Sequence, residues 1–447
     1  MQLMRKLILA ASCLALVVSG AGAVDTLAVH QDSLANGLKI LTVEKPGLPL
    51  VSFQVWYRVG SRNERPGITG ISHLLEHMMF KGTDKIGPEE FSRIVQKYGG
   101  HSNAFTSQDY TAYYENISTE FLSVAMELES DRMANLKLDP REFEPERNVV
   151  KEERRLRENS PYGRLFEEMN AAAYTAHPYG WPVLGWMTDI EAITPQDLRD
   201  YYRIYYAPNN AACVIVGAVN RKEAVALVDK YFGGIPRNKT SPPRVTTIEP
   251  PQMGERRVKV LKDTRMPLVA MGYHTPEIGQ PDTYALELLS NILSNGESSR
   301  LYRSLVYDKQ LALFAGGYND TQTDPTLFIF YSAPLKGHNT EELEQAITEE
   351  LEKIKRDGVS PRELQKSKNQ LEADFIFQQQ RNNGLAVQIG SAQTRLSWRY
   401  LNSYLKNIRA VSNQDIISAA NKYFIDQNRT VATLIPTGGP QNKGEAQ

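Results

Sequence analysis

Cysteine is scarce in this chain of 447 residues, with Cys13 and Cys213 as its two occurrences. Cys13 lies in an apolar N-terminal stretch that we expect to be removed, and a single remaining cysteine excludes an intrachain disulfide. Cys213 lies in the apolar run 211–216, so we expect it to be a small buried hydrophobic residue. The cysteine count therefore permits an oxidising compartment without indicating one.

The chain also lacks an excess of charge of either sign and, after its N-terminus, a long hydrophobic run. Its 51 basic and 52 acidic residues give a net charge of −1, which argues against nucleic-acid binding and a basic membrane-binding face. No apolar run reaches the roughly 18 residues that span a bilayer. At 41% hydrophobic and 23% charged residues, the composition is that of a globular protein of two or three domains.

Residues 1–23 have the pattern of a signal peptide. Arg5 and Lys6 form a basic start, residues 7–18 are apolar apart from Ser12, and small residues at 19–23 fit an A-x-A cleavage site. The alternative is an uncleaved anchor or a first core helix. The pattern predicts export, which in a double-membraned bacterium leads to the periplasm; a secreted or membrane-tethered form is the alternative.

Two segments that lie 218 residues apart, 193–210 and 411–428, are similar to each other. Without a gap, Gln196, Asp197, Tyr205 and Asn210 match Gln414, Asp415, Tyr423 and Asn428. Each segment predicts a capped helix and a turn, and each is followed by an apolar run typical of a buried strand. We therefore expect a duplicated domain of about 200 residues.

The domain limits follow from composition. Residues 234–254 are polar and rich in proline, which predicts a linker between an N-terminal domain at 24–233 and a C-terminal domain at 255–437. The tail 438–447 is predicted to be disordered. Alternation over 51–59 predicts a half-buried strand, whereas other segments have helical spacing. The expected fold class is α+β, with two duplicated domains that each contain a mostly antiparallel sheet covered by helices.

The sharpest motif is His73-Leu-Leu-Glu76-His77, in a helix that Gly67–Ser72 can begin and Gly82 can end. Apolar residues form one stripe of this helix, whereas His73, Glu76 and His77 lie on another face. Histidines four residues apart can reach a single ion, and Glu76 can accept a proton from water at that ion. The spacing predicts zinc; the alternative is two ordinary histidines near a glutamate.

A catalytic zinc site needs a third protein ligand. Residues 145–158 predict a helix with Pro145 at its start, on which Glu146 and Glu153 share a stripe with Val149 and Val150. A run of charges is more often a solvated helix face. From spacing alone, Glu153 as ligand and the solvated face remain equally open.

At this point the sequence resembles the pitrilysin, insulin-degrading enzyme and mitochondrial processing peptidase family. The resemblance rests on residues 70–82 around the histidines, the segment Glu146–Glu153 that begins Glu-Arg-Asn-Val-Val, Asn103-Ala-Phe-Thr106, and Gly296-Glu-Ser-Ser-Arg-Leu-Tyr302. It extends through nearly the whole chain after the signal peptide. Family members of this length form one half of a clam-shaped chamber.

The resemblance implies a role for each motif residue. His73, His77 and Glu153 would bind one zinc ion, Glu76 would be the general base, and Glu146 would support His77 from behind. The segment Asn103, Ala104, Phe105 and Thr106 would lie on an edge strand to which peptide substrates add as a further strand. An ordinary turn residue is the alternative for Asn103. We interpret the neighbouring His101 as a loop residue rather than a ligand.

The sequence departs from the family in its second half, where complete family enzymes carry a substrate-binding arginine and a tyrosine seven residues apart. Val306 and Leu313 align with these positions, and Arg303 and Tyr307 are close but out of register. We therefore expect a homologous partner subunit that supplies the pair and lacks the zinc motif, with a homodimer as the alternative. The predicted function is a zinc-dependent endopeptidase that cuts short or unfolded peptides. A non-catalytic scaffold, or an exported metal- or peptide-binding module, is the alternative.

Overall fold

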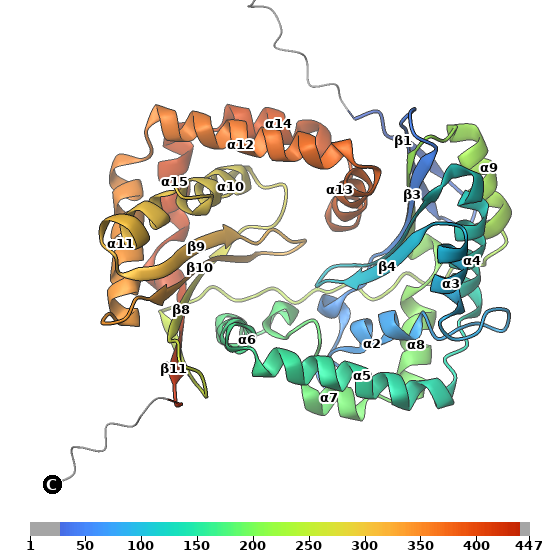
Figure 1. Ribbon diagram of the computed structural model, residues 1–447, viewed down its shortest axis with the longest axis horizontal. Coiled ribbons are helices and arrows are strands. Elements are labelled where there is room, and N and C mark those ends of the chain that lie inside the picture. The colour runs from blue at the N-terminus through green and yellow to red at the C-terminus, as the bar shows by residue number, and fades with distance from the viewer. Residues whose placement is uncertain (1–26, 439–447) are drawn as a thin grey trace, which may run out of the picture.

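The computed structural model describes residues 27–438, which form two halves that each contain one β-sheet (Figure 1). The signal peptide predicted at 1–23 and nearly all of the tail predicted at 438–447 lie outside the described residues. No helix within 27–438 combines the length and the apolar character needed to cross a membrane.

The first half contains six strands and eight α-helices among the described residues. The strands are β1 (His30–Ser33), β2 (Lys39–Glu44), β3 (Leu50–Tyr57), β4 (His101–Thr106), β5 (Thr111–Ser118) and β6 (Ala211–Gly217). The helices are α2 (Ile71–Met78), α3 (Glu90–Lys97), α4 (Leu122–Asn135), α5 (Pro140–Asn159), α6 (Pro161–Ala173), α7 (Met187–Ala192), α8 (Pro195–Tyr205) and α9 (Arg221–Phe232). Short 3₁₀ turns include η1 (Ser61–Asn63) and η3 (Pro178–Gly180).

The second half contains five strands, six α-helices and the π-helix η5 (Tyr302–Asp308) among the described residues. The strands are β7 (Arg256–Lys262), β8 (Leu268–Thr275), β9 (Ala312–Asn319), β10 (Thr326–Pro334) and β11 (Arg429–Pro436). The helices are α10 (Pro281–Ser294), α11 (Thr340–Asp357), α12 (Pro361–Gln380), α13 (Asn382–Arg395), α14 (Tyr400–Ala410) and α15 (Asn413–Tyr423). Between Phe232 and Arg256 there is no helix or strand.

The two sheets have the same topology, which confirms the predicted α+β class and the duplication. The order β2-β6-β3-β5-β4 in the first half corresponds to β7-β11-β8-β10-β9 in the second, and β1 is added to the first sheet. In each described sheet one pair is parallel, β2 with β6 and β7 with β11, and the remaining pairs are antiparallel.

The repeated sequence segments occupy equivalent places in the two halves. Asp197 and Asp415 complete capping boxes at the starts of α8 and α15. The Asn210 amide donates to the Tyr205 carbonyl oxygen at 2.8 Å, and the Asn428 amide donates to the Tyr423 carbonyl oxygen at 2.9 Å. These asparagines hold each helix end against the strand that follows it, which explains why they recur in the sequence.

Strand β3 differs from the prediction, because it is buried on both faces rather than half-buried. Helices α2, α4, α8 and α9 cover one face of the first sheet. Helix α13 of the second half covers the other face, where Trp56 packs with Leu385 and Ile389. The alternation over 51–59 predicted a strand with one exposed face. That face is instead covered by α13, whose residues lie more than 300 positions away in the chain.

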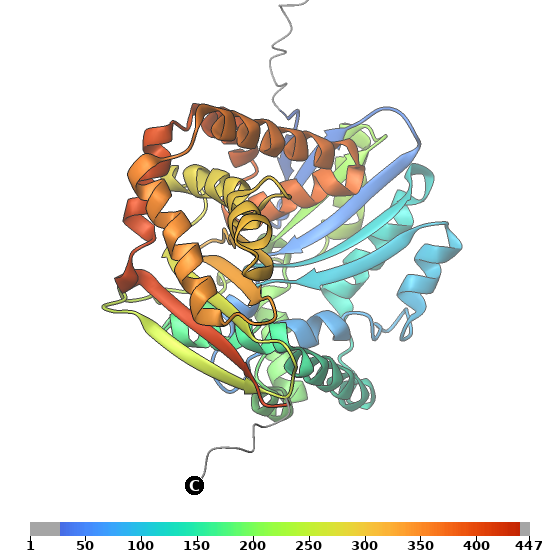
Figure 2. The ribbon, with the colours of Figure 1, turned by 60° about the vertical axis from the view of Figure 1, so that its left-hand side comes forward.

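Each half contributes a helix that packs on the sheet of the other half, and Figures 1 and 2 show this arrangement from two sides. Helix α6 of the first half packs on the second sheet, where Leu165 and Met169 meet Leu268 and Ala270. Two side chains from strands of that sheet contact the Ala173 carbonyl oxygen at the end of α6. Arg256 Nη1 lies 2.6 Å from this oxygen, and His274 Nε2 lies 3.0 Å from it. Each half therefore buries one sheet face with a helix that belongs to the other half.

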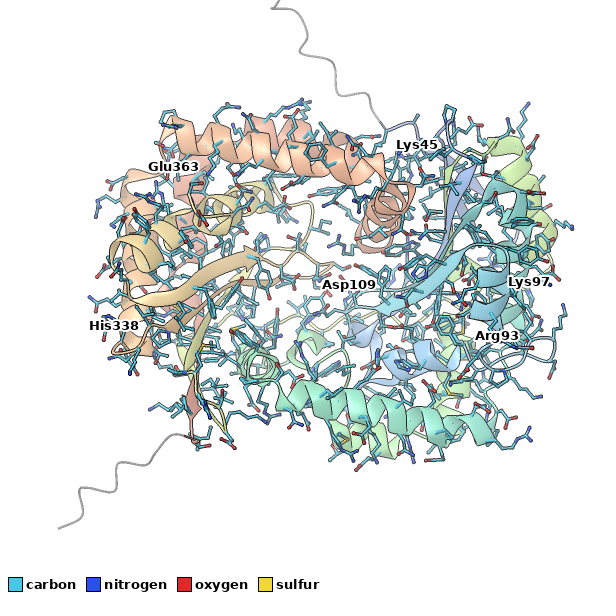
Figure 3. All side chains as sticks on the ribbon, in the orientation of Figure 1. Lys45, Arg93, Lys97, Asp109, His338 and Glu363 are labelled. Carbon is cyan, nitrogen blue, oxygen red and sulfur yellow. The ribbon has the colours of Figure 1, made fainter. Side chains whose placement is uncertain are left out.

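A polar contact joins the turns at the ends of the two sheets. Asp109, in the turn between β4 and β5, lies near the centre of the molecule (Figure 3). Its carboxylate accepts hydrogen bonds from the Tyr179 hydroxyl at 2.6 Å and from the Thr323 backbone N–H at 2.8 Å. Thr323 lies in the turn between β9 and β10, so the two strand pairs are fixed relative to each other.

The packing of α13 on the first sheet predicts that any side chain at Gly390 destabilises the protein. A Cβ atom at this position would lie 2.1 Å from Cε2 of the fully buried Trp56. Gly390→Ala should therefore lower the free energy of unfolding by about 1–3 kcal/mol, although alanine favours helices. Chemical denaturation checks this, with Gly234→Ala as the control, because no atom lies within 4 Å of a Cβ there. Equal stability of Gly390→Ala and wild type would contradict the described packing.

Candidate metal centre

Helix α2 is held by its first turn and its apolar face, which leaves its polar face outside the core. Its first turn is bound by the buried Glu64, whose carboxylate oxygens accept from the Gly70 N–H at 2.8 Å and the Ser72 N–H at 2.9 Å. The predicted apolar stripe, which includes Leu74 and Met78, is buried in the core. The opposite face, with His73, Glu76 and His77, is half-buried.

Helix α5 carries the predicted third ligand, but its start differs from the prediction. It begins at Pro140 after the N-cap Asp139, and Pro145 lies inside it. A proline costs one intrahelical hydrogen bond, which a helix of 20 residues tolerates. The four residues of the expected stripe all lie on this helix, and Val149 is 46% exposed. The buried positions of α5 are Phe143, Glu146, Val150 and Arg154.

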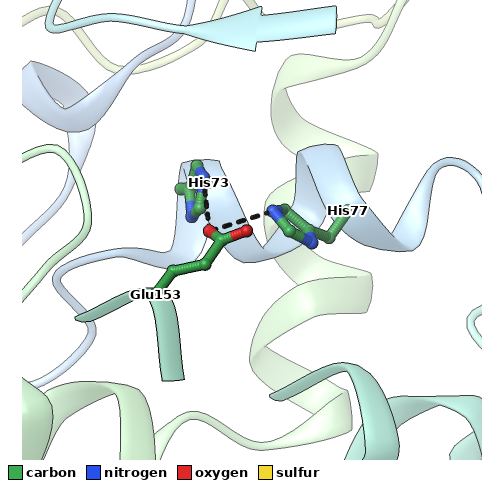
Figure 4. Close-up of side chains that lie close together, drawn as sticks. All are labelled: His73, His77 and Glu153. Carbon is green, nitrogen blue, oxygen red and sulfur yellow. Dashed lines mark ion pairs between the residues drawn. The ribbon is translucent and has the colours of Figure 1, made fainter. Parts of the chain in front are cut away.

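Glu153 lies at the margin of this buried face and points towards both histidines (Figure 4). Its Oε2 atom lies 3.6 Å from His73 Nε2 and 3.5 Å from His77 Nε2. Within residues 27–438, this is the one group of three or more histidine, cysteine or acidic side chains that could share a metal ion. Tetrahedral zinc with bonds of about 2.0–2.1 Å separates its ligand atoms by about 3.3–3.4 Å. The three side chains therefore fit a zinc ion.

The two imidazoles have different electrostatic environments. Burial, followed by the charge of His77, lowers the pKa of His73 to about 3, so this ring is neutral. His77 Nδ1 lies 2.7 Å from Glu146 Oε1. Because a carboxylate only accepts, Nδ1 donates, and Nε2 is the ring nitrogen that faces Glu153. Burial lowers the pKa of His77, but the hydrogen bond to Glu146 and nearby carboxylates outweigh this effect and raise it.

Glu146 is placed where the sequence predicted it, behind His77. Its second oxygen lies 2.7 Å from Lys81 Nζ, in an ion pair. Burial raises the pKa of Glu146, whereas the hydrogen bonds from His77 and Lys81 lower it, and the net shift is downward. The carboxylate therefore stays ionised and holds the imidazole in one orientation.

Glu76 lies beside these residues and has a different environment. Burial raises the pKa of its carboxyl group, and a hydrogen bond from the Thr106 hydroxyl partly offsets the increase. A raised pKa makes the Glu76 carboxylate a stronger proton acceptor than an exposed glutamate, which suits a general base.

The predicted substrate segment forms strand β4, at the edge of the first sheet, and pairs with β5 alone among the described strands. Thr106 contacts Glu76 on the side of α2, whereas the Phe105 ring packs 5.4 Å from the Trp56 ring on the side of α13. Asn103 is therefore a strand residue rather than a turn residue. His101 is the exposed first residue of β4, so the loop predicted for it is wrong.

The second half contains no arginine–tyrosine pair at the aligned positions. Val306 is half-buried in η5, and Leu313, 50% exposed, lies on β9 at the edge of the second sheet. The Arg303 guanidinium lies 4.8 Å from the centre of the Tyr307 ring, so these neighbours contact each other.

Three residues that support the site were missed at the sequence level. Lys81 lies four residues after His77, which is a helical neighbour spacing that could have been recognised. The fully buried Arg154 lies four residues after Val150, but the surrounding charges hid it. Glu64 gave no local signal, because it reaches the start of α2 from six residues upstream of Gly70.

Comparison with protein families and known sequences gives consistent similarities. The model of the insulinase family (peptidase family M16) matches residues 39–186, and that of the peptidase M16 inactive domain matches residues 192–371. The chain is 36% identical to zinc protease PqqE of Helicobacter pylori, over 96% of this chain and 99% of the relative. It is 26% identical to "Probable mitochondrial-processing peptidase subunit beta" of Arabidopsis thaliana, over 90% of this chain and 78% of the relative.

Solved structures show the same similarity in three dimensions. A protease from Helicobacter pylori, 35% identical, superposes with a TM-score of 0.89 over 91% of this chain and 99% of that one. A peptidase M16 inactive domain from Pseudomonas fluorescens is 17% identical and has a TM-score of 0.82, over 92% and 98% of the two chains. The latter shows the fold alone.

The contact between His77 and Glu146 yields a prediction about metal affinity. Glu146→Ala should weaken zinc binding by about 10–100-fold, because the imidazole loses the group that orients it. Competition with a chromogenic zinc chelator measures the change. Glu152→Ala is the matched control on the same helix, because Glu152 is exposed and pairs with Arg155 instead. Equal affinities of the two variants would show that Glu146 does not support a bound ion.

Proposed function

Because the chain belongs to the insulinase family, peptidase family M16, we propose that it is a zinc-dependent endopeptidase that hydrolyses short or unfolded peptides. The observation that carries this proposal is the convergence of His73, His77 and Glu153 within 4.8 Å of one another. Glu76 lies beside this group with a raised pKa. A protein that served only as a scaffold would not need this combination.

In the proposed mechanism, His73, His77 and Glu153 hold the metal and Glu76 moves protons. A zinc ion bound there supplies Lewis acidity, which polarises the scissile carbonyl and makes water more acidic. Glu76 takes a proton from the attacking water as the carbon–oxygen bond forms. It then delivers this proton to the amine nitrogen as the carbon–nitrogen bond breaks, so that acid and amine products result.

Strand β4 would hold the peptide during this reaction. Its outer edge is free of other strands among the described residues, so an extended peptide can add to the sheet through main-chain hydrogen bonds. Asn103, Ala104, Phe105 and Thr106 would be the residues in register with the substrate. Thr106 also contacts Glu76, which places the end of this strand next to the proposed base. Binding through the main chain favours segments that are not already paired in a fold.

A partner subunit is part of the proposal. The absence of an arginine or tyrosine at 306 and 313 supports a homologous subunit that supplies such a pair and lacks the zinc motif. A homodimer is the second arrangement. The signal peptide expected at 1–23 would place the activity in the periplasm, with a secreted or membrane-tethered form as the alternative.

The second candidate function is a non-catalytic scaffold or peptide-binding subunit of the same family. The match of residues 192–371 to a domain described as inactive concerns the part of the chain that follows the proposed metal ligands. The intact His73, Glu76, His77 and Glu153 favour catalysis over this candidate.

Replacing the proposed base tests the mechanism directly. Glu76→Gln should keep one zinc ion per chain and lower cleavage of an internally quenched unstructured peptide by about 10²–10⁴-fold, because the proton acceptor is lost. Metal analysis and initial rates give the two readouts. Glu152→Gln, the same change on the exposed face of α5, should retain full activity. Unchanged cleavage by the Glu76→Gln protein would overturn the assignment.

The partner requirement is tested by adding the missing chain. The protein alone should show low kcat/KM, and a homologous chain with the arginine–tyrosine pair should raise it in proportion to the complex formed. Analytical ultracentrifugation measures the assembly in parallel. Full activity of a monomeric preparation would contradict the need for a second subunit.

A further inference from the structure

A second candidate binding site lies in the second half, away from α2 and α5. A cavity of about 290 Å³ is bounded by α10, α12, α13, α14 and the turn between β9 and β10. Phe375, Tyr400 and Tyr404 line it with aromatic rings. The Phe375 and Tyr404 rings stack at a centroid distance of 5.0 Å, and those of Tyr400 and Tyr404 are 5.9 Å apart. The cavity is large enough to hold one long side chain or a small organic molecule.

Glu287 is the carboxylate of this cavity. One of its oxygens accepts a hydrogen bond from the Tyr404 hydroxyl at 2.7 Å. Among the described residues, no other hydrogen bond and no ion pair reaches Glu287. The Glu287 side chain also lines an adjoining cavity of about 320 Å³, whose other walls are mostly serine and asparagine residues of α10 and β9.

The arginine that lines the same cavity donates its hydrogen bonds to other residues. Arg395 also lines the cavity, but its guanidinium donates to the Thr321 carbonyl oxygen and to the Ser391 hydroxyl, the latter at 2.6 Å. Burial raises the pKa of Glu287 to about 7, and the Tyr404 hydroxyl and the charge of Arg395 offset only part of this effect. An ionised carboxylate held away from water is costly unless it is paired, and Arg395 lowers the pKa of Glu287 without forming an ion pair with it.

We propose that this cavity binds the ammonium or guanidinium group of a ligand, with Glu287 as its counter-ion and the rings of Tyr400 and Tyr404 as its walls. A cation held against aromatic faces and paired with a carboxylate gains from both interactions, and a partly desolvated site strengthens them. Pockets at the boundary between domains are frequent ligand sites, and α13 is the helix that joins this cavity to the first sheet.

Two sources can supply such a group. One is a free small amine or guanidine. The other is a lysine or arginine side chain of a bound peptide, and this source rests on the proposed peptidase function. Thr321 at the cavity lies two residues before Thr323, which bonds Asp109 in the turn after β4. A peptide that leaves β4 past Thr106 would therefore run towards the cavity.

Binding experiments separate the two sources without requiring cleavage. In the first, agmatine is titrated calorimetrically into the wild-type protein and into Glu287→Gln, which keeps an acceptor for Tyr404 but loses the charge. In the second, fluorescence anisotropy compares two labelled peptides, identical except for lysine or norleucine, in the Glu76→Gln background with and without Glu287→Gln. Glu297→Gln is the control, since Glu297 is exposed on the loop after α10.

We expect a preference for the cationic ligand on the order of tenfold in proteins that retain Glu287 and its loss in Glu287→Gln. Loss in the agmatine arm assigns a free cation, and loss in the peptide arm assigns a side chain; either supports the site. Preserved binding in both arms, or no binding of any cation to wild type, would overturn it. If Glu287→Gln does not fold, Val387→Phe blocks the cavity from α13 and must give the same losses. Failure of the proposed hydrolysis would leave both binding measurements unaffected.

Discussion

The packing of α6 on the second sheet is the interaction on which the geometry of the candidate metal centre depends. Glu153 belongs to α5, and Ser160 alone separates α5 from α6. Helix α6 is held by the apolar residues of the second sheet and by Arg256 and His274 at its end. The proposed third metal ligand is thus positioned by the half of the molecule that contributes none of the proposed ligands, whereas the two histidines are positioned by the first sheet and Glu64. The second half therefore contributes to the geometry of the candidate site through its contacts with α6.

Two buried arginines, Arg154 and Arg132, hold the helices around the candidate site. Arg154 is fully buried next to Glu153 in the chain, and it pairs with Glu167 of α6 at 2.5 Å. Arg132 of α4 pairs with Glu129 and contacts the rings of Phe80, just after α2, and of Tyr113 on β5. A buried pair of this kind is costly to break, because the remaining partner is left unpaired in the core. Both arginines therefore help to hold the helices that carry the proposed ligands.

The sequence predicted local features well and long-range ones poorly. The His73-x-x-Glu76-His77 spacing predicted a shared helix face because such spacing depends on helix geometry alone, and the repeated Asn210 and Asn428 make the same local bond in each half. Glu153 could not be chosen from spacing, because its contact with the histidines depends on the route of the chain over 76 residues. The double burial of β3 and the role of Glu64 were missed for the same reason: each depends on tertiary contacts that leave no periodic pattern.

The cover of the first sheet by α13 has a consequence for how the chain acquires its structure during synthesis. The apolar face around Trp56 meets residues near Ile389, so the chain must be almost complete before this face is buried. The N-terminal half therefore cannot reach its final core as it emerges, and contacts of such large sequence separation slow folding. Such a delay would suit the proposed export, because a chain that cannot complete its core until residues near Ile389 have been made is still incompletely folded when most of it has been synthesised.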